Sequence, residues 1–342
     1  MKIGKLTNEQ LSALVLSRLP ALSSSTVVGS DIGADCAWID LGDQMMVISS
    51  DPVTAGGMES GTLTVHVSCN DIAACGVKPT GILIDIIAPP SCSEEDISKI
   101  VEDASREAKN IGVDIVGGHT EVSESVNTFV VISTAFGLVS KDHPVPLGRA
   151  VEGDSLIITK TCGIEGSYIA VTEHADKLTS LPSELLENVR SYVSRISVVP
   201  EGVVTGSLFS STGKKNDRGY GLGAADLLHD VTEGGILGAA YEMAHISGLG
   251  ITVDETLIPI TEETQKICSI LDINPFRLIS SGSMLIASPE PERILSALGE
   301  AGIDACVIGK FTSAADGYNR VDKVTGCITE LTPPEADELY GM

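Results

Sequence analysis

Aromatic and basic residues are scarce in this chain, and each shortage excludes a class of protein. Phe, Trp and Tyr make up 4% of the 342 residues, which predicts an aliphatic core and few platforms on which nucleic-acid bases could stack. Lys and Arg number 22 against 47 Asp and Glu, a formal net charge of −25. Proteins that bind nucleic acids or anionic membranes carry basic stripes, and the sequence has none. We therefore expect neither as a partner.

Long apolar runs and paired cysteines are missing as well. No uninterrupted apolar stretch of about 18 residues occurs, so no transmembrane helix is expected. The first residues also lack the ordered regions of a signal peptide. The eight cysteines form no C-x-x-C pair, a usage typical of reduced, mostly buried thiols rather than of disulfides or a zinc site. These features favour a cytoplasmic protein.

The chain does contain enough aliphatic material for two domains. Hydrophobic residues make up 43% of the sequence, and its length exceeds that of one ordinary core. A stretch rich in Pro, Gly and charge, residues 140–153, separates two regions in which strand and helix patterns alternate. We expect an α/β (α+β) protein with an N-terminal domain at 1–145 and a C-terminal domain at 150–342.

The first region contains one long helical pattern and several strand patterns. Ser93 and Asp96 have the spacing of a capping box, and the apolar residues after them keep a helical period as far as Ile111. The strand patterns cover residues 45–51, 81–90, 113–116 and 127–139, and the second region begins with another at 155–161.

The standard phosphate-binding and hydrolase motifs are absent, and acidic residues take their place. The sequence has no G-x-x-x-x-G-K-[ST], H-E-x-x-H or G-x-S-x-G. Singly, each acid is typical of a helix cap, a turn or a surface group. Together they favour Mg²⁺, a hard ion that binds carboxylates and can bridge to a polyphosphate. The acids that follow apolar runs or adjoin glycine are Asp35, Asp51, Asp71, Glu121, Asp230 and Glu233.

The stretch DIVGGHTE places Gly117 and Gly118 between a strand pattern and the polar residues His119 and Thr120. An ordinary turn is one interpretation. The other is a phosphate-contacting turn, in which the glycines allow a close backbone approach and Thr120 offers a hydroxyl to phosphate or metal.

The histidines and lysines beside these motifs have a simpler interpretation. We expect His119 and His229 to act as structural hydrogen-bonding groups, although His119 belongs to the glycine motif. Lys78 and Lys160 are the basic residues nearest to the motifs, and we expect both to lie at the surface.

Seven motifs occur in one order along residues 25–315. They are GADCAWI, SSDPVT, HVSCNDIAACGVKPTGILI, IVGGHTEV, GDSLIITKTCGIEGSYIA, HDVTEGGILGAAYEMA and SSGSMLIA. In this order they resemble the aminoimidazole ribonucleotide (AIR) synthetase superfamily, with a PurM-like fold. Its members include the purine enzyme, thiamine-monophosphate kinase, selenophosphate synthetase and the hydrogenase maturation factor HypE, which makes the cyanide ligand. SSDPVT and GGHTEV are most similar to the AIR synthase-related group close to that factor.

The resemblance implies a fold, an assembly and a cofactor. The N-terminal sheet would pair with that of a dimer mate into a barrel, and ATP and Mg²⁺ would lie in the cleft between the two domains. It also implies metal ligands, nucleotide contacts and catalytic acids. The metal ligands are Asp35, Asp51 and Asp71; the nucleotide contacts are Asn70, Gly117, Gly118, His119 and Thr120; the catalytic acids are Asp71 and Asp230, the latter facing the terminal phosphate or the substrate.

Three departures from the family pattern bear on the chemistry. Many relatives carry two adjacent acids where this chain has Ala34 and Asp35, so one ligand is lost or is supplied by Asp31. The selenophosphate enzymes need a reactive Cys or Sec in their N-terminal glycine-rich segment. In this chain no cysteine precedes Cys36. The maturation factor ends in a cysteine, whereas the last cysteine here is Cys327. The acidic tail after it is expected to be repelled by the acidic protein.

These features predict a homodimeric, ATP- and Mg²⁺-dependent enzyme that phosphorylates or activates an oxygen of a diffusible small molecule, as kinases and ATP-dependent dehydratases do. One alternative is a non-catalytic or regulatory nucleotide-binding relative. Another is a hydrogenase-maturation-type factor that acts with a partner protein. A metal-dependent phosphohydrolase fits the acids but not the order of the motifs. No motif specifies the acceptor substrate.

Overall fold

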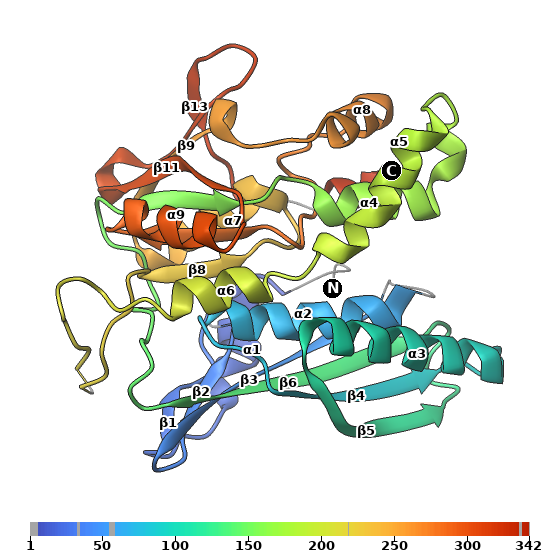
Figure 1. Cartoon of the computed structure of the whole chain (residues 1–342), viewed down its shortest axis with the longest axis horizontal. Coiled ribbons are helices and arrows are strands. Elements are labelled where there is room, and N and C mark those ends of the chain that lie inside the picture. The colour runs from blue at the N-terminus through green and yellow to red at the C-terminus, as the bar shows by residue number, and fades with distance from the viewer. Residues whose placement is uncertain (1–5, 33–34, 55–58, 218, 335–336, 342) are drawn as a thin grey trace.

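The computed structural model describes residues 6–32, 35–54, 59–217, 219–334 and 337–341. Two sheets, each with its own helices, lie one above the other, with the first half of the chain in the lower layer of Figure 1. The α/β class predicted from the sequence is confirmed. Within these residue ranges, no helix is both long enough and apolar enough to cross a membrane.

The first sheet lies under two helices that cover one of its faces (Figure 1). These are α2 (Ser60–Ala74) and α3 (Glu94–Ile111). Neighbouring strands are antiparallel except β4 and β5, which are parallel because α3 crosses over between them. Among the described residues the strand order is β1 (Thr26–Val28), β2 (Ala37–Asp40), β3 (Gln44–Val53), β6 (Val130–Ser140), β4 (Gly81–Ala88) and β5 (Asp114–Val122).

The two faces of the first sheet differ in burial. Val47 of β3 and Ile84 of β4 are buried and belong to one apolar cluster with Ile72 of α2. Residues one position along each strand point to the other face, because the strand period is two. There Leu83 and Leu138 remain about 40% exposed, so the single chain leaves an apolar face uncovered.

The second sheet forms the core of the upper layer. Its inner strands β7 and β10 are almost fully buried, as expected of a sheet with both faces covered. In the described part of the chain its strand order is β13 (Ile328–Glu330), β12 (Tyr318–Val321), β9 (Gly250–Asp254), β11 (Ala305–Thr312), β7 (Ser155–Thr159), β10 (Met284–Ser288) and β8 (Leu227–Asp230).

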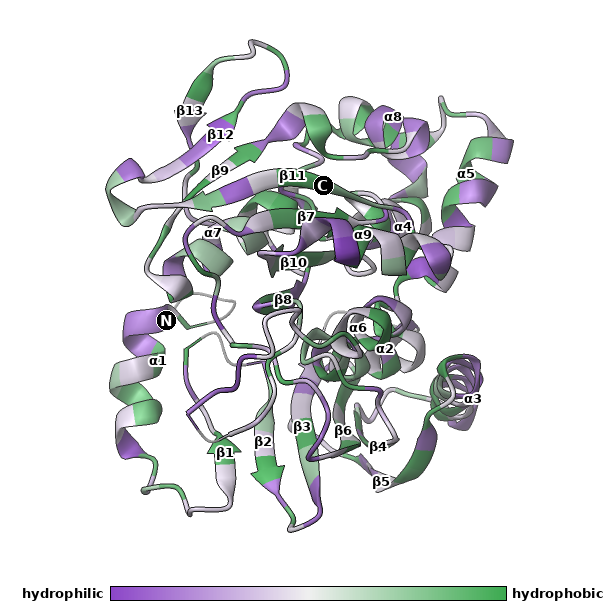
Figure 2. Cartoon of the chain, turned by 60° about the vertical axis from the view of Figure 1, so that its left-hand side comes forward, coloured by the Kyte–Doolittle hydropathy of each residue, from purple (hydrophilic) through white to green (hydrophobic). Residues whose placement is uncertain are grey.

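The remaining helices belong mostly to the second half of the chain. Those of the second half are α4 (Ile164–Glu173), α5 (Ser183–Arg190), α6 (Val199–Gly206), α7 (Gly235–Ser247), α8 (Glu262–Leu271) and α9 (Pro291–Glu300). Figure 2 shows α1 (Asn8–Leu14) at the side of the molecule, with hydrophilic and hydrophobic residues mixed along it. None of the α1 residues is buried.

Helix α6 fixes the upper layer on the lower one by packing directly against α2 (Figure 1). A Cβ atom at Gly202 would overlap the backbone carbonyl of Ala73, and one at Gly206 would overlap the carbonyl of Gly76. Only residues without a side chain allow this approach. The two helices therefore meet backbone to backbone.

Lys160 supports the segment that leads into α6, and its expected surface position is wrong. Its ammonium donates to the carbonyl oxygens of Arg195 (3.1 Å) and Ser197 (2.7 Å) and pairs with the buried Glu201 at 2.7 Å. The residue also has a φ of 53°, which side chains other than glycine rarely adopt. Burial lowers the pKa of Lys160 and the charge of Glu201 opposes that change. Lys78, by contrast, is exposed as expected.

The long helix predicted from periodicity is confirmed, including the capping box of Ser93 and Asp96. The predicted strand at 45–51 corresponds to β3 and that at 81–90 to β4. Strands of the first sheet lie within 26–140 and those of the second within 155–330. The domain limits at 145 and 150 stay predictions.

Glu165 in the first turn of α4 is an enclosed carboxyl group. Its side chain is 6% exposed, and Oε2 has no hydrogen-bond partner. Burial raises the pKa of Glu165 to about 7, and the charges of Asp337 and Glu233 add to this, while hydrogen bonds from Ser281 oppose it. The folded protein therefore holds a proton that the unfolded chain releases near pH 4.5.

Replacing Gly202 by alanine should destabilise the protein by about 2 kcal/mol or more, because the added methyl group overlaps the backbone of α2. The matched control is Gly299→Ala in α9, where an added Cβ meets nothing within 4 Å. That substitution should stabilise by about 0.5–1 kcal/mol through helix propensity. Urea unfolding measures both. Equal stability of Gly202→Ala and the unmodified chain would contradict the proposed backbone contact.

Glu165 should make stability fall as pH rises. Because its pKa is raised in the folded state, its contribution is complete below about pH 4.5 and is lost as pH approaches 7. Between pH 5 and pH 8 the free energy of unfolding of the unmodified chain should decrease through this group. Glu165→Gln cannot ionise at this position, so its decrease should be smaller by on the order of 3 kcal/mol. Urea unfolding at several pH values measures this, with exposed Glu95→Gln as the control. An unchanged pH slope in Glu165→Gln would show that Glu165 ionises normally.

Candidate functional site

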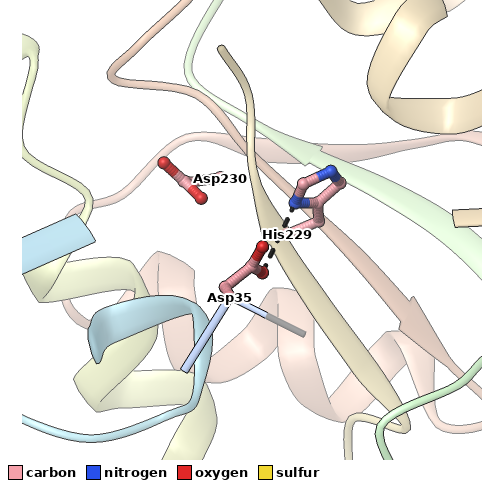
Figure 3. Close-up of side chains that lie close together, drawn as sticks. All are labelled: Asp35, His229 and Asp230. Carbon is pink, nitrogen blue, oxygen red and sulfur yellow. Dashed lines mark ion pairs between the residues drawn. The ribbon is translucent and has the colours of Figure 1, made fainter. Parts of the chain in front are cut away.

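Four carboxylates from different elements meet between the two layers. Asp35 precedes β2, Asp51 lies in β3, Asp71 lies near the end of α2, and Asp230 is the last residue of β8. The charges of the other three all act on Asp71. Asp35, Asp230 and His229 each offer one ligand atom, and these atoms lie within 4.8 Å of one another. Figure 3 shows the three side chains converging.

Asp71 lies at the centre of this acid cluster. Strand alternation places Ser49 and Asp51 on the same face of β3, toward α2. The hydroxyl of Ser49 donates to Asp71 Oδ2 at 2.6 Å and lies 3.5 Å from Asp51 Oδ2. Burial raises the pKa of Asp71 well above its ordinary value, and the charges of Asp230, Asp51 and Asp35 raise it further. The cluster therefore favours binding of a positive charge.

His229 lies between two carboxylates, which agrees with its predicted hydrogen-bonding role. Its Nδ1 is 3.7 Å from Asp35 Oδ2, the ion pair drawn in Figure 3, and its Nε2 is 3.4 Å from Glu242 Oε2 of α7. Burial lowers the pKa of His229. The nearby carboxylates of Asp35 and Glu242 more than offset that effect and raise the pKa well above 6.5. A protonated imidazole has no lone pair for a metal, so in this state His229 neutralises the acids rather than binding a cation.

Asn70, predicted to contact nucleotide, joins the two layers in this structure. Its Nδ2 donates to the carbonyl of Ile196 (3.0 Å), and its Oδ1 accepts from the N–H of Val198 (2.9 Å). The side chain is 1% exposed. These bonds fix the end of α2 and so position Asp71; a nucleotide contact by Asn70 stays a prediction.

The predicted turn at Gly117 and Gly118 is wrong, because β5 continues through both glycines to Val122. Val116 forms a bulge: Ile82 pairs with Ile115 and Leu83 pairs with Gly117. Gly118 has a φ of 148°, and a Cβ there would overlap the carbonyl of Ile84. Close approach of two strands explains that glycine without any ligand.

The glycine motif also lies apart from the acid cluster of the same chain. Asp51 aligns with Ser133, Ser133 with Ile84, and Ile84 with Gly118. Three steps of about 4.8 Å between strands separate Asp51 from Gly118 by about 14 Å. His119 is 64% exposed and lies 3.3 Å from Glu121, and Thr120 is exposed as well. The structure therefore brings Asp35, Asp51, Asp71 and Asp230 together but not residues 117–120.

Three further residues complete the description of the site. Asp31 accepts a hydrogen bond from the N–H of its neighbour Ile32. Among the described residues, Asp31 does not belong to the group of possible metal ligands formed by Asp35, His229 and Asp230. Ser49 and Glu242 were not identified from the sequence. The spacing of Ser49 and Asp51 on one strand could have indicated Ser49, whereas nothing local indicates that Glu242 pairs with His229.

Comparisons with known proteins agree with this architecture. The protein-family model described as "AIR synthase related protein, N-terminal domain" matches residues 33–139, and the family model of the corresponding C-terminal domain matches residues 216–322.

Individual relatives match along most of their length. A putative hydrogenase expression/formation protein of Methanocaldococcus jannaschii is 29% identical over 323 residues, or 92% of this chain and 90% of that protein. Carbamoyl dehydratase HypE of Rhodobacter capsulatus is 26% identical over 281 residues, which cover 80% of this chain and 76% of that protein. The solved structure of hydrogenase maturation protein HypE in complex with ATP has a TM-score of 0.66 at 21% identity, covering 98% of this chain and 97% of that one. This likeness establishes a shared fold.

Proposed function

Because the chain belongs to the AIR synthase-related family, we propose that it is an ATP- and Mg²⁺-dependent enzyme that phosphorylates or activates an oxygen of a small molecule. The observation that carries the proposal is the meeting of Asp35, Asp51, Asp71 and Asp230 between the two layers. A relative with this fold was solved in complex with ATP.

The acid cluster has the chemistry that a hard divalent cation requires. Asp35, Asp51 and Asp71 would hold Mg²⁺ through carboxylate oxygens, and Asp230 would face the terminal phosphate or the acceptor. The bound ion would offset the repulsion between ATP and a protein of net charge −25. Burial raises the pKa of Asp71, and the charges of Asp230, Asp51 and Asp35 raise it further; a bound cation would offset the effect of these charges.

A second copy of the chain is part of the proposal. Every residue of the edge strand β5 is exposed, and an uncovered strand edge beside an apolar face requires a partner. Within one chain, three strand spacings of about 4.8 Å separate residues 117–120 from the acid cluster. In a homodimer formed through this sheet, the partner's copy of that segment would supply the predicted phosphate contacts.

A hydrogenase-maturation role is the second candidate, favoured by the names of two relatives. The family resemblance implies that this chemistry uses a cysteine, and Cys327 is the candidate in this sequence. Cys327 is a free, exposed thiol between β12 and β13. Turnover of Mg·ATP by Cys327→Ala, with small-molecule acceptors offered, would favour a diffusible substrate. Loss of turnover with intact ATP binding would favour the maturation role, and absence of turnover in the unmodified chain would favour a non-catalytic relative.

Asp71→Asn should weaken ATP binding in the presence of Mg²⁺ by at least about 10-fold, because a metal-binding carboxylate is removed. The protein should stay folded, since the substitution also relieves repulsion by Asp51, Asp35 and Asp230. Titration calorimetry measures the affinity, with exposed Asp176→Asn as a control of equal charge change. Unchanged affinity in Asp71→Asn would exclude Asp71 from the site.

The unmodified chain should be a dimer at micromolar concentration, and Leu138→Glu should make it a monomer by placing a charge on the apolar sheet face. Light scattering measures the mass of each form. Leu257→Glu is the matched control, because Leu257 is also an exposed leucine but lies in the second half of the chain. A monomeric unmodified chain, or equal dissociation by both variants, would contradict this interface.

A further inference from the structure

Residues 331–333, which follow β13, are anchored in the second layer. Leu331 is 1% exposed, and its N–H donates to the carbonyl of Tyr318 at 3.0 Å. Arg277 donates to the carbonyl oxygens of Thr332 (2.8 Å) and Pro333 (3.3 Å). The expected repulsion of this acidic tail is therefore wrong: contacts at hydrogen-bond distance outweigh long-range repulsion, which salt screens.

Asp337 is the buried anchor of the tail, with a side chain that is 3% exposed. Its Oδ2 accepts from the N–H of Gly234 at 2.7 Å. Its Oδ1 accepts from the N–H groups of Ile279 (3.2 Å) and Leu339 (2.8 Å). Both carboxylate oxygens are therefore used, and each accepts a charge-assisted bond from the backbone.

The bond to Gly234 completes the start of α7. Gly234 is the N-cap residue of this helix and has no side chain with which to cap it. Asp337, 103 positions later in the sequence, accepts from the N–H of Gly234. In a capping box a residue of the helix itself makes this bond. A carboxylate at this end is also favoured by the helix dipole.

Helix α7 is connected to the acid cluster in two ways. Only the short segment 231–234 separates Asp230, the end of β8, from the helix. That segment is held at one end by a bond from the N–H of Val231 to the carbonyl of Ser283 (3.0 Å) and at the other by Asp337. About two turns further along, α7 carries Glu242, the partner of His229. Displacement of the start of α7 would shift both groups.

We propose that Asp337 is a positioning residue, which fixes the start of α7 and through it Asp230 and the His229–Glu242 pair. The inference rests on the proposed function, since it assigns the tail a role in the same site. The two carboxylate oxygens of Asp337 accept from the backbone N–H groups of Gly234, Ile279 and Leu339. The tail of this chain thus serves the site through a carboxylate and its backbone partners.

The test compares Asp337→Ala, Asp337→Asn and a chain that ends at Pro334 with the full-length protein. Amide hydrogen exchange of residues 231–237 should become at least 10-fold faster in all three, because the start of α7 loses its anchor. Affinity for Mg·ATP should fall about 10-fold. Asp337→Asn should show part of each effect, since an amide offers one acceptor oxygen and turns a donor toward a backbone N–H.

The matched control is Glu255→Gln, which alters another buried carboxylate of the second layer. Glu255 pairs with Arg320 and accepts from the N–H of Lys323 at 3.0 Å. This variant should leave exchange at 231–237 and Mg·ATP affinity unchanged even if it lowers overall stability. Equal effects of Glu255→Gln and Asp337→Ala would reduce Asp337 to a general stabilising group and overturn the proposal.

The two readouts separate the inference from the function on which it rests. If the full-length chain does not bind Mg·ATP, the proposed function fails, and hydrogen exchange alone decides whether Asp337 holds residues 231–237. If it binds Mg·ATP and the Asp337 variants match it in both readouts, the proposed function stands and the positioning role is refuted.

Discussion

Backbone contact between α2 and α6, which glycines at both crossing points permit, holds the first half of the chain against the second. Asn70 reinforces the contact by bonding the backbone at Ile196 and Val198. Asp71 is the next residue after Asn70, so its carboxylate is fixed relative to Asp230, which belongs to the other layer. Together with the apolar cluster that both layers share, this contact fixes the position of the site between them.

The same contact forces like charges together. Two unit charges about 4 Å apart repel by about 1 kcal/mol in water and by about 4 kcal/mol in partly buried surroundings. One hydrogen bond, such as that from Ser49 to Asp71, contributes about 1 kcal/mol and cannot offset several such pairs. Protonation of Asp71, the charge on His229 and a bound cation are the remaining ways to relieve the repulsion. Burial and neighbouring carboxylates raise the pKa of Asp71, and Asp35 and Glu242 raise that of His229 despite its burial; both directions favour the first two ways.

The sequence identified the acids because each follows a local signal. Asp51 and Asp230 lie in or at the end of apolar strands, so each is marked in the sequence by the apolar run before it. The helix at 94–111 could also be predicted from the sequence, since capping and periodicity are local. Interactions between distant segments could not be predicted in this way. The ammonium group of Lys160, for example, is held below the surface by the carbonyl groups of Arg195 and Ser197, which lie 35 and 37 residues away in the sequence.

The glycine motif shows a different limit of sequence interpretation. A Gly-Gly pair is equally consistent with a turn around a ligand and with two strands in close contact, because both need a position without Cβ. Gly118 meets the second requirement through Ile84 of β4. In the proposed homodimer, the motif would contact phosphate bound at the acid cluster of the second copy, an arrangement that the Gly-Gly pattern by itself does not specify.

The bond between Asp337 and Gly234 has a consequence for synthesis of the chain. During translation a helix is made from its first residue onward, but α7 waits for a capping group that is made 103 residues later. Until residue 337 leaves the ribosome, β8 and α7 can fold without the carboxylate that fixes their junction. The order of translation therefore places completion of this junction after synthesis of β8 and α7 themselves.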